Sequence, residues 1–251
     1  MTSADRFEFL LRLGDNALVL GQRLSEWVGK GPILEEDIAM TNVGLDLIGQ
    51  ARLWLAYAGE VEGRGRDEDA LAFRRDANGF RNALLVEQPN GDYADTMARQ
   101  FLFDHWHLIA LRALAESSDA TVAAIAAKSA KEAAYHAERS TDWVIRLGDG
   151  TDESHARMQR AIDELWMYAG ELFAPDPVDD AARVAGIGPD LAALAAPWRT
   201  RVDAALAEAT LVAPADDWAQ GGGRQGRHTE HLGHLLAEMQ FLQRAYPDAR
   251  W

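Results

Sequence analysis

The sequence contains no cysteine among its 251 residues. This absence excludes disulfide bonds, thiolate metal sites and cysteine nucleophiles. No apolar run approaches the roughly 18 residues that a helix needs to span a bilayer. The first residues, MTSADRFEFLLRLGDN, have neither a basic start nor a long apolar stretch, so they do not predict a secretory signal. We therefore expect a cytoplasmic protein.

Basic residues are scarce relative to acidic ones. The chain has 25 Lys and Arg residues against 40 Asp and Glu residues, which gives a formal net charge of −15. A surface of this charge disfavours nucleic acids and anionic membranes as partners, because both are negative. With 48% hydrophobic and 26% charged residues, the composition is that of a globular protein, and the length suits one large domain.

Helical periodicity runs through most of the chain, and no strand pattern exceeds a few residues. Two pairs of long helices, within residues 5–60 and 92–147, predict the core of a ferritin-like four-helix bundle. Residues 151–251 are expected to add C-terminal helices to the same all-α domain, which covers 1–251. The expected helices span residues 5–28, 35–60, 67–75, 92–116, 121–147, 151–173, 190–212 and 228–246, with one short helix within 174–188.

Local signals mark two helix boundaries. Thr151 or Asp152 is expected to cap the helix that follows Gly148–Asp149–Gly150. Pro197 either kinks the helix predicted over 190–212 or marks its true start, because proline lacks the backbone N–H.

Carboxylates in the middle of the long helices raise the question of a metal site. Ferritin-like di-iron proteins use a Glu from each of two helices and Glu-x-x-His from the other two. Here Glu132 is followed by Tyr135 where the pattern needs His, and Asp46 is followed by Gly49. Asp104 offers a single carboxylate on a further helix. The sequence therefore predicts an altered site that lacks both imidazoles.

Two histidines lie close to these positions. Asp104 and His107 have the three-residue spacing of a ligand pair, whereas His136 lies about 100° further round its helix than Tyr135. An independent di-iron or di-manganese oxidase built on these residues is one interpretation. The simpler one is that the polar residues pair with basic side chains, since a paired buried charge is tolerated. The basic residues considered are Arg12, Arg52, Arg99 and Lys131.

Two further motifs lie near the last helix. His228, His231 and His234 recur at three-residue intervals, as a helical metal site would need. They have no acidic partner in the pattern, so a capped, solvated helix start is the simpler interpretation. Gly221–Gly226, with the sequence GGGRQG, either binds an anion through backbone N–H groups or forms a tightly turned loop.

Arginines gather just before the segment LLVEQPNG. Arg74, Arg75 and Arg81 lie close together in sequence and lead into Asn82. The planar guanidinium donates two hydrogen bonds at once to a phosphate, so the cluster is a candidate site for the phosphates of coenzyme A. The alternative is a set of surface arginines that balance nearby acids. These acids are Asp67, Glu68, Asp69 and Asp76.

Several blocks of the sequence together resemble one known family. They are LGDNALVLGQRLSEW, EEDIAMTNVGLDLIGQAR, LLVEQPNGDYADTMARQ followed by DHWH, KEAAYH with RLGDGTDES, and HTEHLGHLLAEMQFLQR. In order and extent they are similar to the PaaC-type subunit of the bacterial phenylacetyl-CoA epoxidase, a ring-1,2-phenylacetyl-CoA monooxygenase of the ferritin-like superfamily.

The resemblance implies a structural subunit that supports a di-iron catalytic subunit of related fold, the PaaA-type subunit. The two are expected to form a dimer of heterodimers, joined by a small bridging subunit and served by a reductase that uses FAD, an iron–sulfur cluster and NADPH. The complex forms the ring 1,2-epoxide of phenylacetyl-CoA in aerobic phenylacetate degradation, and we expect the substrate at the subunit interface.

On this view the chain has no catalytic residue, metal or cofactor of its own. Its vestigial metal-site positions are Asp46, Gly49, Asp104, His107, Glu132, Tyr135 and His136. Two other functions stay open: the independent oxidase described above, and a stand-alone helical binding protein without an oxygenase partner. Metal analysis separates the first from the structural role, and co-expression with a catalytic subunit separates the second.

Overall fold

The computed structural model describes residues 1–216, 218–247 and 249, and all regular secondary structure in that part of the chain is helical. This confirms the predicted all-α class and is consistent with a ferritin-like helical bundle. Among these residues no helix is both long and apolar enough to cross a membrane. The α-helices are α1 (Ser3–Ser25), α2 (Leu34–Glu62), α3 (Glu68–Phe73), α4 (Leu84–Glu87), α5 (Tyr93–Leu114), α6 (Ala120–Gly148), α7 (Asp152–Trp166), α8 (Pro177–Val184), α9 (Ala195–Glu208), α10 (Glu230–Met239) and α11 (Phe241–Ala245). The 3-10 turns are η1 (Ala77–Gly79), η2 (Gly170–Phe173), η3 (Ala192–Leu194) and η4 (Gly223–Gln225).

The chain divides into two compact units. The first contains Met1–Pro89 and the residues from Gly222 on, and the second contains Asn90–Gly221. The first unit is thus discontinuous in sequence, whereas the second is one continuous stretch. The residues from Gly222 on belong with the N-terminal helices and not with the rest of the expected C-terminal addition. A single domain over 1–251 stays a prediction.

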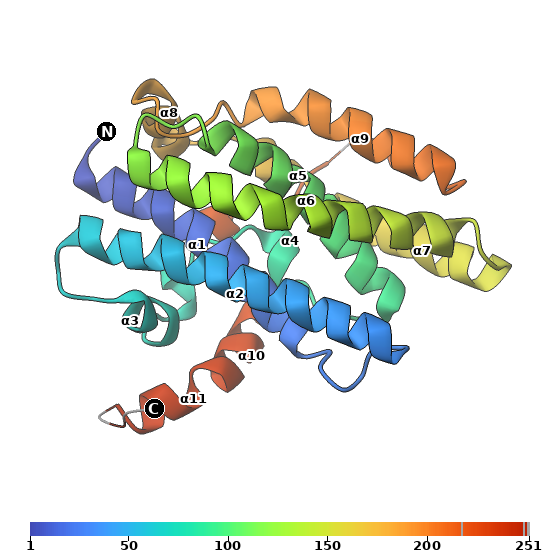
Figure 1. Cartoon of the computed structure of the whole chain (residues 1–251), viewed down its shortest axis with the longest axis horizontal. Coiled ribbons are helices and arrows are strands. Elements are labelled where there is room, and N and C mark those ends of the chain that lie inside the picture. The colour runs from blue at the N-terminus through green and yellow to red at the C-terminus, as the bar shows by residue number, and fades with distance from the viewer. Residues whose placement is uncertain (217, 248, 250–251) are drawn as a thin grey trace. The chain divides into compact units, whose positions relative to one another are not determined.

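The first unit is organised around α1 and α2, which lie side by side in Figure 1. Large apolar side chains such as Leu10, Leu20 and Trp54 are at most 1% exposed. A Cβ at Gly14 would lie 2.7 Å from Cδ2 of Leu55, so glycine at this position lets the two helices approach closely.

The second unit is organised around α5 and α6, and α7 and α9 pack against them. Most of α5 is buried, including Phe101 and Phe103 on different sides of the helix. A helix buried nearly all round carries its polar residues into the interior. That burial determines the environment of Asp104 and His107.

Polar caps fix where the helices of this unit start. The Asp92 side chain accepts hydrogen bonds from the backbone N–H groups of Ala94 (2.8 Å) and Asp95 (3.1 Å), and the Asp95 side chain accepts one from the Asp92 N–H in return. Asp119 caps α6 through two backbone N–H groups, and Thr151 caps α7. The prediction of a cap at Thr151 is confirmed.

Two helix ends differ from those expected. α7 ends at Trp166 instead of residue 173, and η2 follows after a short turn. α9 begins at Ala195, so Pro197 lies in its first turn, where the missing N–H has no helical partner to lose. The interpretation of Pro197 as a marker of the helix start is confirmed.

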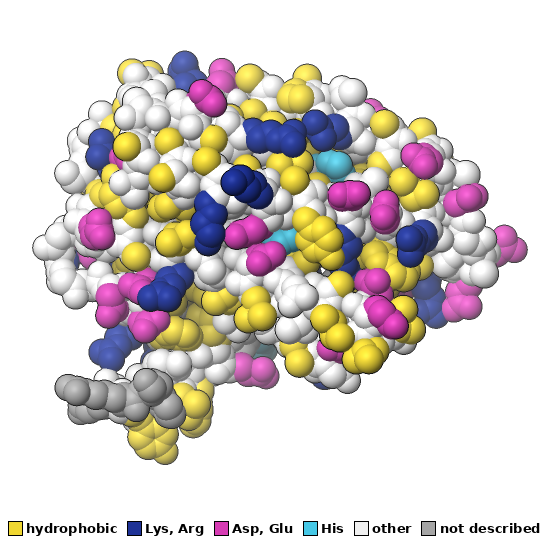
Figure 2. Space-filling model, viewed as in Figure 1, with side chains coloured by type: hydrophobic (Ala, Val, Ile, Leu, Met, Phe, Trp, Pro, Cys, Tyr) yellow, Lys and Arg dark blue, Asp and Glu magenta, His cyan; other side chains and the backbone are white. Residues whose placement is uncertain are grey.

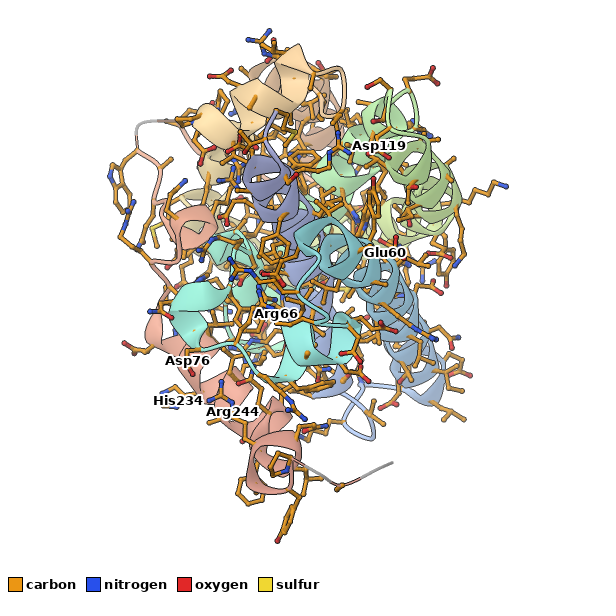
Figure 3. All side chains as sticks on the ribbon, turned by 90° about the vertical axis from the view of Figure 1, so that its left-hand side faces the viewer. Glu60, Arg66, Asp76, Asp119, His234 and Arg244 are labelled. Atoms are coloured by element: carbon orange, nitrogen blue, oxygen red, sulfur yellow. The ribbon has the colours of Figure 1, made fainter. Side chains whose placement is uncertain are left out.

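The last predicted helix is broken into α10 and α11 at Gln240. Its side chain donates hydrogen bonds to the backbone oxygens of Ala72 (2.9 Å) and Arg75 (3.0 Å). One turn later Arg244 pairs with Asp76 at 2.9 Å, and Figure 3 shows both side chains at the surface of the first unit. These bonds hold α10 and α11 against the segment that follows α3.

Candidate functional site

The most strongly perturbed carboxyl group lies on α5. Asp104 is 2% exposed, and burial raises its pKa to about 6 because the charged form loses its water. His136, the Ser140 hydroxyl and Arg139 oppose this rise, but burial outweighs them. Within the described part of the chain, Oδ1 of Asp104 has no hydrogen-bond partner. Asp104 is a buried acid that gives up its proton only near pH 6.

His107 lies one turn after Asp104 and is 7% exposed. Burial lowers its pKa to about 3, with a further contribution from His136, so the imidazole is neutral. The ring centre lies 5.0 Å from that of Phe103 and 6.4 Å from that of Trp106. Both Asp104 and His107 therefore point into the interior of the second unit.

On α6 the buried side chain is His136 and not Tyr135. His136 is 1% exposed, whereas Tyr135 is 50% exposed. The buried face of α6 contains Ala133 and Ala137, and at 100° per residue Tyr135 lies on the opposite side of the helix. Tyr135 does not face the interior, contrary to the expectation that it occupies an inward ligand position.

Glu132 lies at the edge of the buried face of α6. Its carboxylate is 3.7 Å from the ammonium group of Lys128, whose side chain is 62% exposed. A pair open to solvent in this way contributes at most about 1 kcal/mol. Lys128 takes the place expected for Lys131, because residues four apart on a helix share a face and adjacent residues do not.

The donor set does not fit a di-iron centre, which needs four carboxylates and two imidazoles. Asp46 and Gly49 lie half-buried on α2, in the first unit. In the second unit Asp104, His107 and His136 are within electrostatic reach of one another. No three His, Asp or Glu side chains of the described residues are placed to hold one metal ion.

Arg75, from the predicted coenzyme A cluster, is engaged inside the first unit. It is 7% exposed, and its two amino groups bind both carboxylate oxygens of Asp15, one of them at 2.9 Å. The guanidinium also donates to the Gly79 oxygen at 2.9 Å and lies 4.3 Å from the centre of the Phe80 ring. The fork that a phosphate would need is therefore occupied by a buried carboxylate.

Asn82 and Arg81 are also engaged in intramolecular contacts. Asn82 has no exposed surface and donates to Oε2 of Glu87 at 2.8 Å. Arg81 donates through Nε to Glu8 and through Nη1 to the backbone oxygen of Asn78 at 2.7 Å. Its side chain keeps 22% of its surface exposed. Asn82 is thus inaccessible to a ligand, whereas Arg81 is partly accessible.

Arg74 is the exposed member of the cluster. It donates to the backbone oxygen of Pro247 at 2.9 Å, a contact at the surface. Figure 2 shows Asp and Glu side chains scattered over the face drawn, with Lys and Arg side chains among them. Of the four predicted residues, Arg74 is the one best placed to meet a phosphate.

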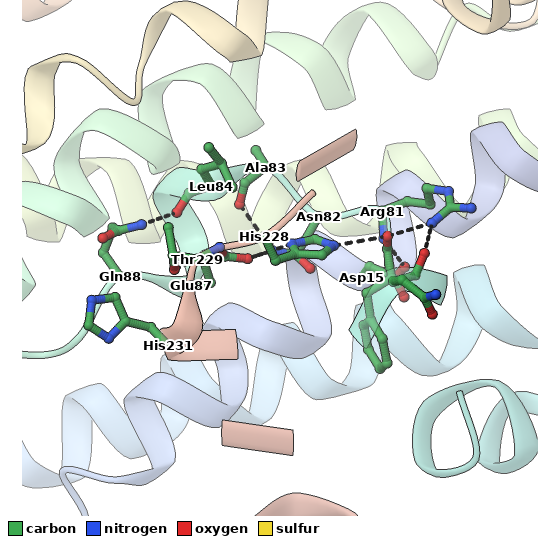
Figure 4. A network of polar contacts seen from close by, with 12 residues as sticks. Asp15, Arg81, Asn82, Ala83, Leu84, Glu87, Gln88, His228, Thr229 and His231 are labelled. Carbon is green, nitrogen blue, oxygen red and sulfur yellow. Dashed lines mark hydrogen bonds and ion pairs between the residues drawn. The ribbon is translucent and has the colours of Figure 1, made fainter. Parts of the chain in front are cut away.

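A buried network around Glu87 was not predicted from the sequence (Figure 4). Oε1 of Glu87 accepts from the backbone N–H of Thr229 (2.7 Å) and from its hydroxyl (2.9 Å). Oε2 accepts from Asn82 and lies 2.7 Å from Nδ1 of His228, while Nε2 of His228 lies 3.1 Å from the backbone oxygen of Phe80. Because a backbone oxygen only accepts, Nε2 carries a proton, and one further proton is shared between Nδ1 and Glu87.

The three histidines near the last helix do not form a ladder. His228 precedes α10, which starts at Glu230, and is buried against Glu87. His231 is half-buried and His234 is exposed. The expectation of a solvated helix start holds for His234 and fails for His228.

The glycine-rich loop closely approaches the backbone of residues 78–84. A Cβ at Gly223 would lie 2.3 Å from the backbone oxygen of Asn82. Gly226 has φ 78°, and a Cβ there would lie 2.4 Å from the backbone oxygen of Asn78. The tightly turned loop therefore accounts for these glycines without a bound anion.

One signal in the sequence points toward the missed network. Glu87 is a single carboxylate within the largely apolar stretch LLVEQP, and an acid in such a place needs a buried partner. The partner, His228, comes 141 residues later, and no local pattern connects the two.

Comparison with known proteins agrees with the resemblance seen in the sequence blocks. A family model described as phenylacetic acid catabolic protein matches residues 1–251. The chain is also 53% identical over 243 residues to the PaaC-type subunit of 1,2-phenylacetyl-CoA epoxidase from Escherichia coli (strain K12). That match covers 97% of this chain and 98% of the E. coli protein. The chain therefore belongs to the phenylacetic acid catabolic protein family.

Proposed function

We propose that this chain is a non-catalytic subunit of a multicomponent phenylacetyl-CoA epoxidase and supports its di-iron catalytic subunit in aerobic phenylacetate degradation. The observation that carries the proposal is the 53% identity to the E. coli protein, which is named as a subunit of 1,2-phenylacetyl-CoA epoxidase. An identity of this size over 97% of the chain supports a common role in a common assembly.

The side chains at the vestigial positions support a structural role. Tyr135 is exposed on the outer side of α6, and Glu132 pairs with Lys128 near the surface. Asp104 is buried with a pKa of about 6, because burial outweighs the cations near it. We infer that the catalytic metals, and the chemistry of oxygen, belong to a PaaA-type partner of related helical fold.

An apolar stripe on α2 supports contact with that partner. Leu34, Ile38 and Leu45 are 70%, 51% and 63% exposed. At 100° per residue they lie within about 40° of one another on the helix. Exposed apolar side chains gathered on one surface indicate a protein contact. We infer that the PaaA-type subunit covers this stripe in a heterodimer, two of which associate through a small bridging subunit, with the FAD, iron–sulfur and NADPH-dependent reductase acting on the partner.

The substrate would meet this chain at the subunit interface. Coenzyme A is anionic, and a protein of net charge −15 needs a local cation to hold it. Arg74 is exposed on the first unit, with Arg81 nearby and partly exposed. These two side chains are the candidates for contact with the phosphates, and Arg75 and Asn82 act beneath them as supports.

Co-expression with a PaaA-type subunit tests the proposal. We expect co-purification and, with the reductase present, epoxide formation from phenylacetyl-CoA that depends on this chain. Leu45→Asp on the apolar stripe should abolish co-purification. Val184→Asp is the matched control, because Val184 is 79% exposed on α8, away from the stripe. Full turnover by the catalytic subunit without this chain would contradict the proposal.

A second candidate is an independent di-iron or di-manganese oxidase. The observation in its favour is that Oδ1 of Asp104 and Nδ1 of His107 are buried without a hydrogen-bond partner among the residues described. Such atoms are where a metal ion or water would bind. Stoichiometric metal together with oxygen consumption by the purified chain alone would favour this candidate over the subunit role.

A further inference from the structure

The second unit contains an aromatic pocket of about 380 Å³ between the end of α7, η2, the start of α9 and the stretch that precedes Gly221. The pocket shares no residue with the positions discussed above for metal or coenzyme A. Its main walls are the side chains of Trp166, Phe173, Trp198, Arg199, Asp216 and Trp218.

The inner walls of the pocket are rigid. The ring of Trp198 lies 5.5 Å from that of Trp166 and 5.0 Å from that of Phe173, centre to centre. Trp198 donates its indole N–H to the backbone oxygen of Leu102 at 3.0 Å. Trp166 and Trp198 are only 6% and 4% exposed. An aromatic surface anchored in this way is formed before any ligand arrives.

The charged groups of the pocket neutralise one another. Asp216 accepts from the Trp166 indole at 2.9 Å and from Arg199 at 2.8 Å. Arg199 also donates to Asp203 at 2.7 Å, and its guanidinium lies 4.9 Å from the Trp166 ring centre. An anionic ligand would be repelled by two carboxylates, and a cation would find Arg199 already on the ring face. The pocket therefore favours an uncharged ligand.

The mouth of the pocket is defined by a close backbone approach. A Cβ at Gly170 would lie 2.5 Å from the Cβ of Ala219, so only glycine lets this stretch lie against η2. The backbone N–H of Gln220 donates to the Met167 oxygen at 2.8 Å and fixes the approach. Trp218, next to Ala219, lines the mouth and is 63% exposed. An indole in this position can cover a ligand that lies on Trp198.

We propose that this pocket binds an uncharged aromatic small molecule with one or two rings. A dry apolar cavity of about 150 Å³ already admits benzene, so 380 Å³ holds a substituted or fused ring. Stacking between the ring and the aromatic walls selects aromatic over saturated ligands. This inference does not depend on the proposed role in an epoxidase.

Calorimetric titration of the full chain with 2-phenylacetamide tests the proposal. We expect saturable binding with one site per chain. Cyclohexylacetamide, phenylacetate and phenethylammonium match the probe in size but lack its ring or its neutrality, and each should bind at least about ten-fold more weakly. Absence of binding, or equal binding of all four compounds, would overturn the proposal.

Two variants locate the site. Ala196→Trp places a large ring in the pocket from an exposed position on α9, and should weaken binding at least about ten-fold. Ala204→Trp, also exposed on α9 but outside the pocket, is the matched control and should bind normally. Trp218→Ala changes only an exposed ring and should weaken binding several-fold. Unchanged binding in both pocket variants, or loss of partner co-purification by Ala196→Trp without loss of ligand binding, would assign the pocket to another role.

Discussion

Nδ1 of His228 lies 2.7 Å from Oε2 of Glu87, although 141 residues separate the two in sequence. The Glu87 side chain has no exposed surface and also binds Thr229 and Asn82. The contact joins the segment before α10 to α4 inside the first unit. Arg23 reinforces this junction, because it donates to the backbone oxygens of Glu87 and His231 at 2.7 and 3.1 Å.

Glu87→Ala should lower the free energy of unfolding by about 3–5 kcal/mol, because it leaves His228 buried without its partner. Glu238→Ala on α10 is the control, since Glu238 is exposed, and should change stability by less than about 0.5 kcal/mol. Urea denaturation followed by circular dichroism measures both. Equal stability of the two variants would contradict the buried pair.

The Asp15–Arg75 pair should behave as one unit. Arg75→Met alone should lose about 3–5 kcal/mol, because Asp15 is fully buried and would keep an unpaired charge. Adding Asp15→Leu should recover part of this loss. Arg74→Met, at the exposed neighbour, serves as the control. Additive losses in the double variant would argue against direct coupling.

The contrast between local and distant partners explains what could be predicted. The long helices and the cap at Thr151 follow from residues close in sequence, and the structure confirms them. The partner of Arg75 is 60 residues away, so the sequence showed only a cluster of arginines. On α6 the ligand pattern suggested that residue 135 points inward, but the small apolar residues of that helix place His136 there instead.

Asp104→Asn tests the effect of burial on a carboxyl group. The pKa of Asp104 is about 6 in the folded chain against an ordinary 3.8, so folding favours the protonated form. Its stabilising contribution is therefore complete below about pH 4 and is lost as the pH rises through about 6. Relative to wild type, the variant should gain about 3 kcal/mol of unfolding free energy between about pH 4 and pH 7.

The control for this pH series is Asp142→Asn, at an exposed position on α6. Its stability relative to wild type should stay nearly constant over the same range. A flat difference for Asp104→Asn as well would show that the Asp104 carboxyl is not buried as described.

Arg74→Ala tests the contact with coenzyme A in the reconstituted complex. The variant should raise the KM for phenylacetyl-CoA several-fold at low salt, and the effect should shrink as salt screens the charge. Arg64→Ala, at another exposed arginine of the first unit, controls for the loss of one positive charge. An identical KM and salt dependence in both variants would remove Arg74 from the substrate site.

Iron content tests the altered metal site. Protein purified from iron-supplemented cultures should contain far less than one iron per chain by mass spectrometry, because the donors of the described residues do not converge. About two irons per chain, lost in Asp104→Asn and in His136→Ala, would instead establish a working di-iron site.

The discontinuity of the first unit has a consequence for how the protein is made. On the ribosome, α1 and α2 emerge long before the residues from Gly222 on, which contain the partners of Glu87 and Arg23. The second unit, Asn90–Gly221, is complete at that time and can fold as it emerges. The part of the chain that is translated first is therefore the last to be finished, and it must wait with Glu87 unpaired until His228 arrives.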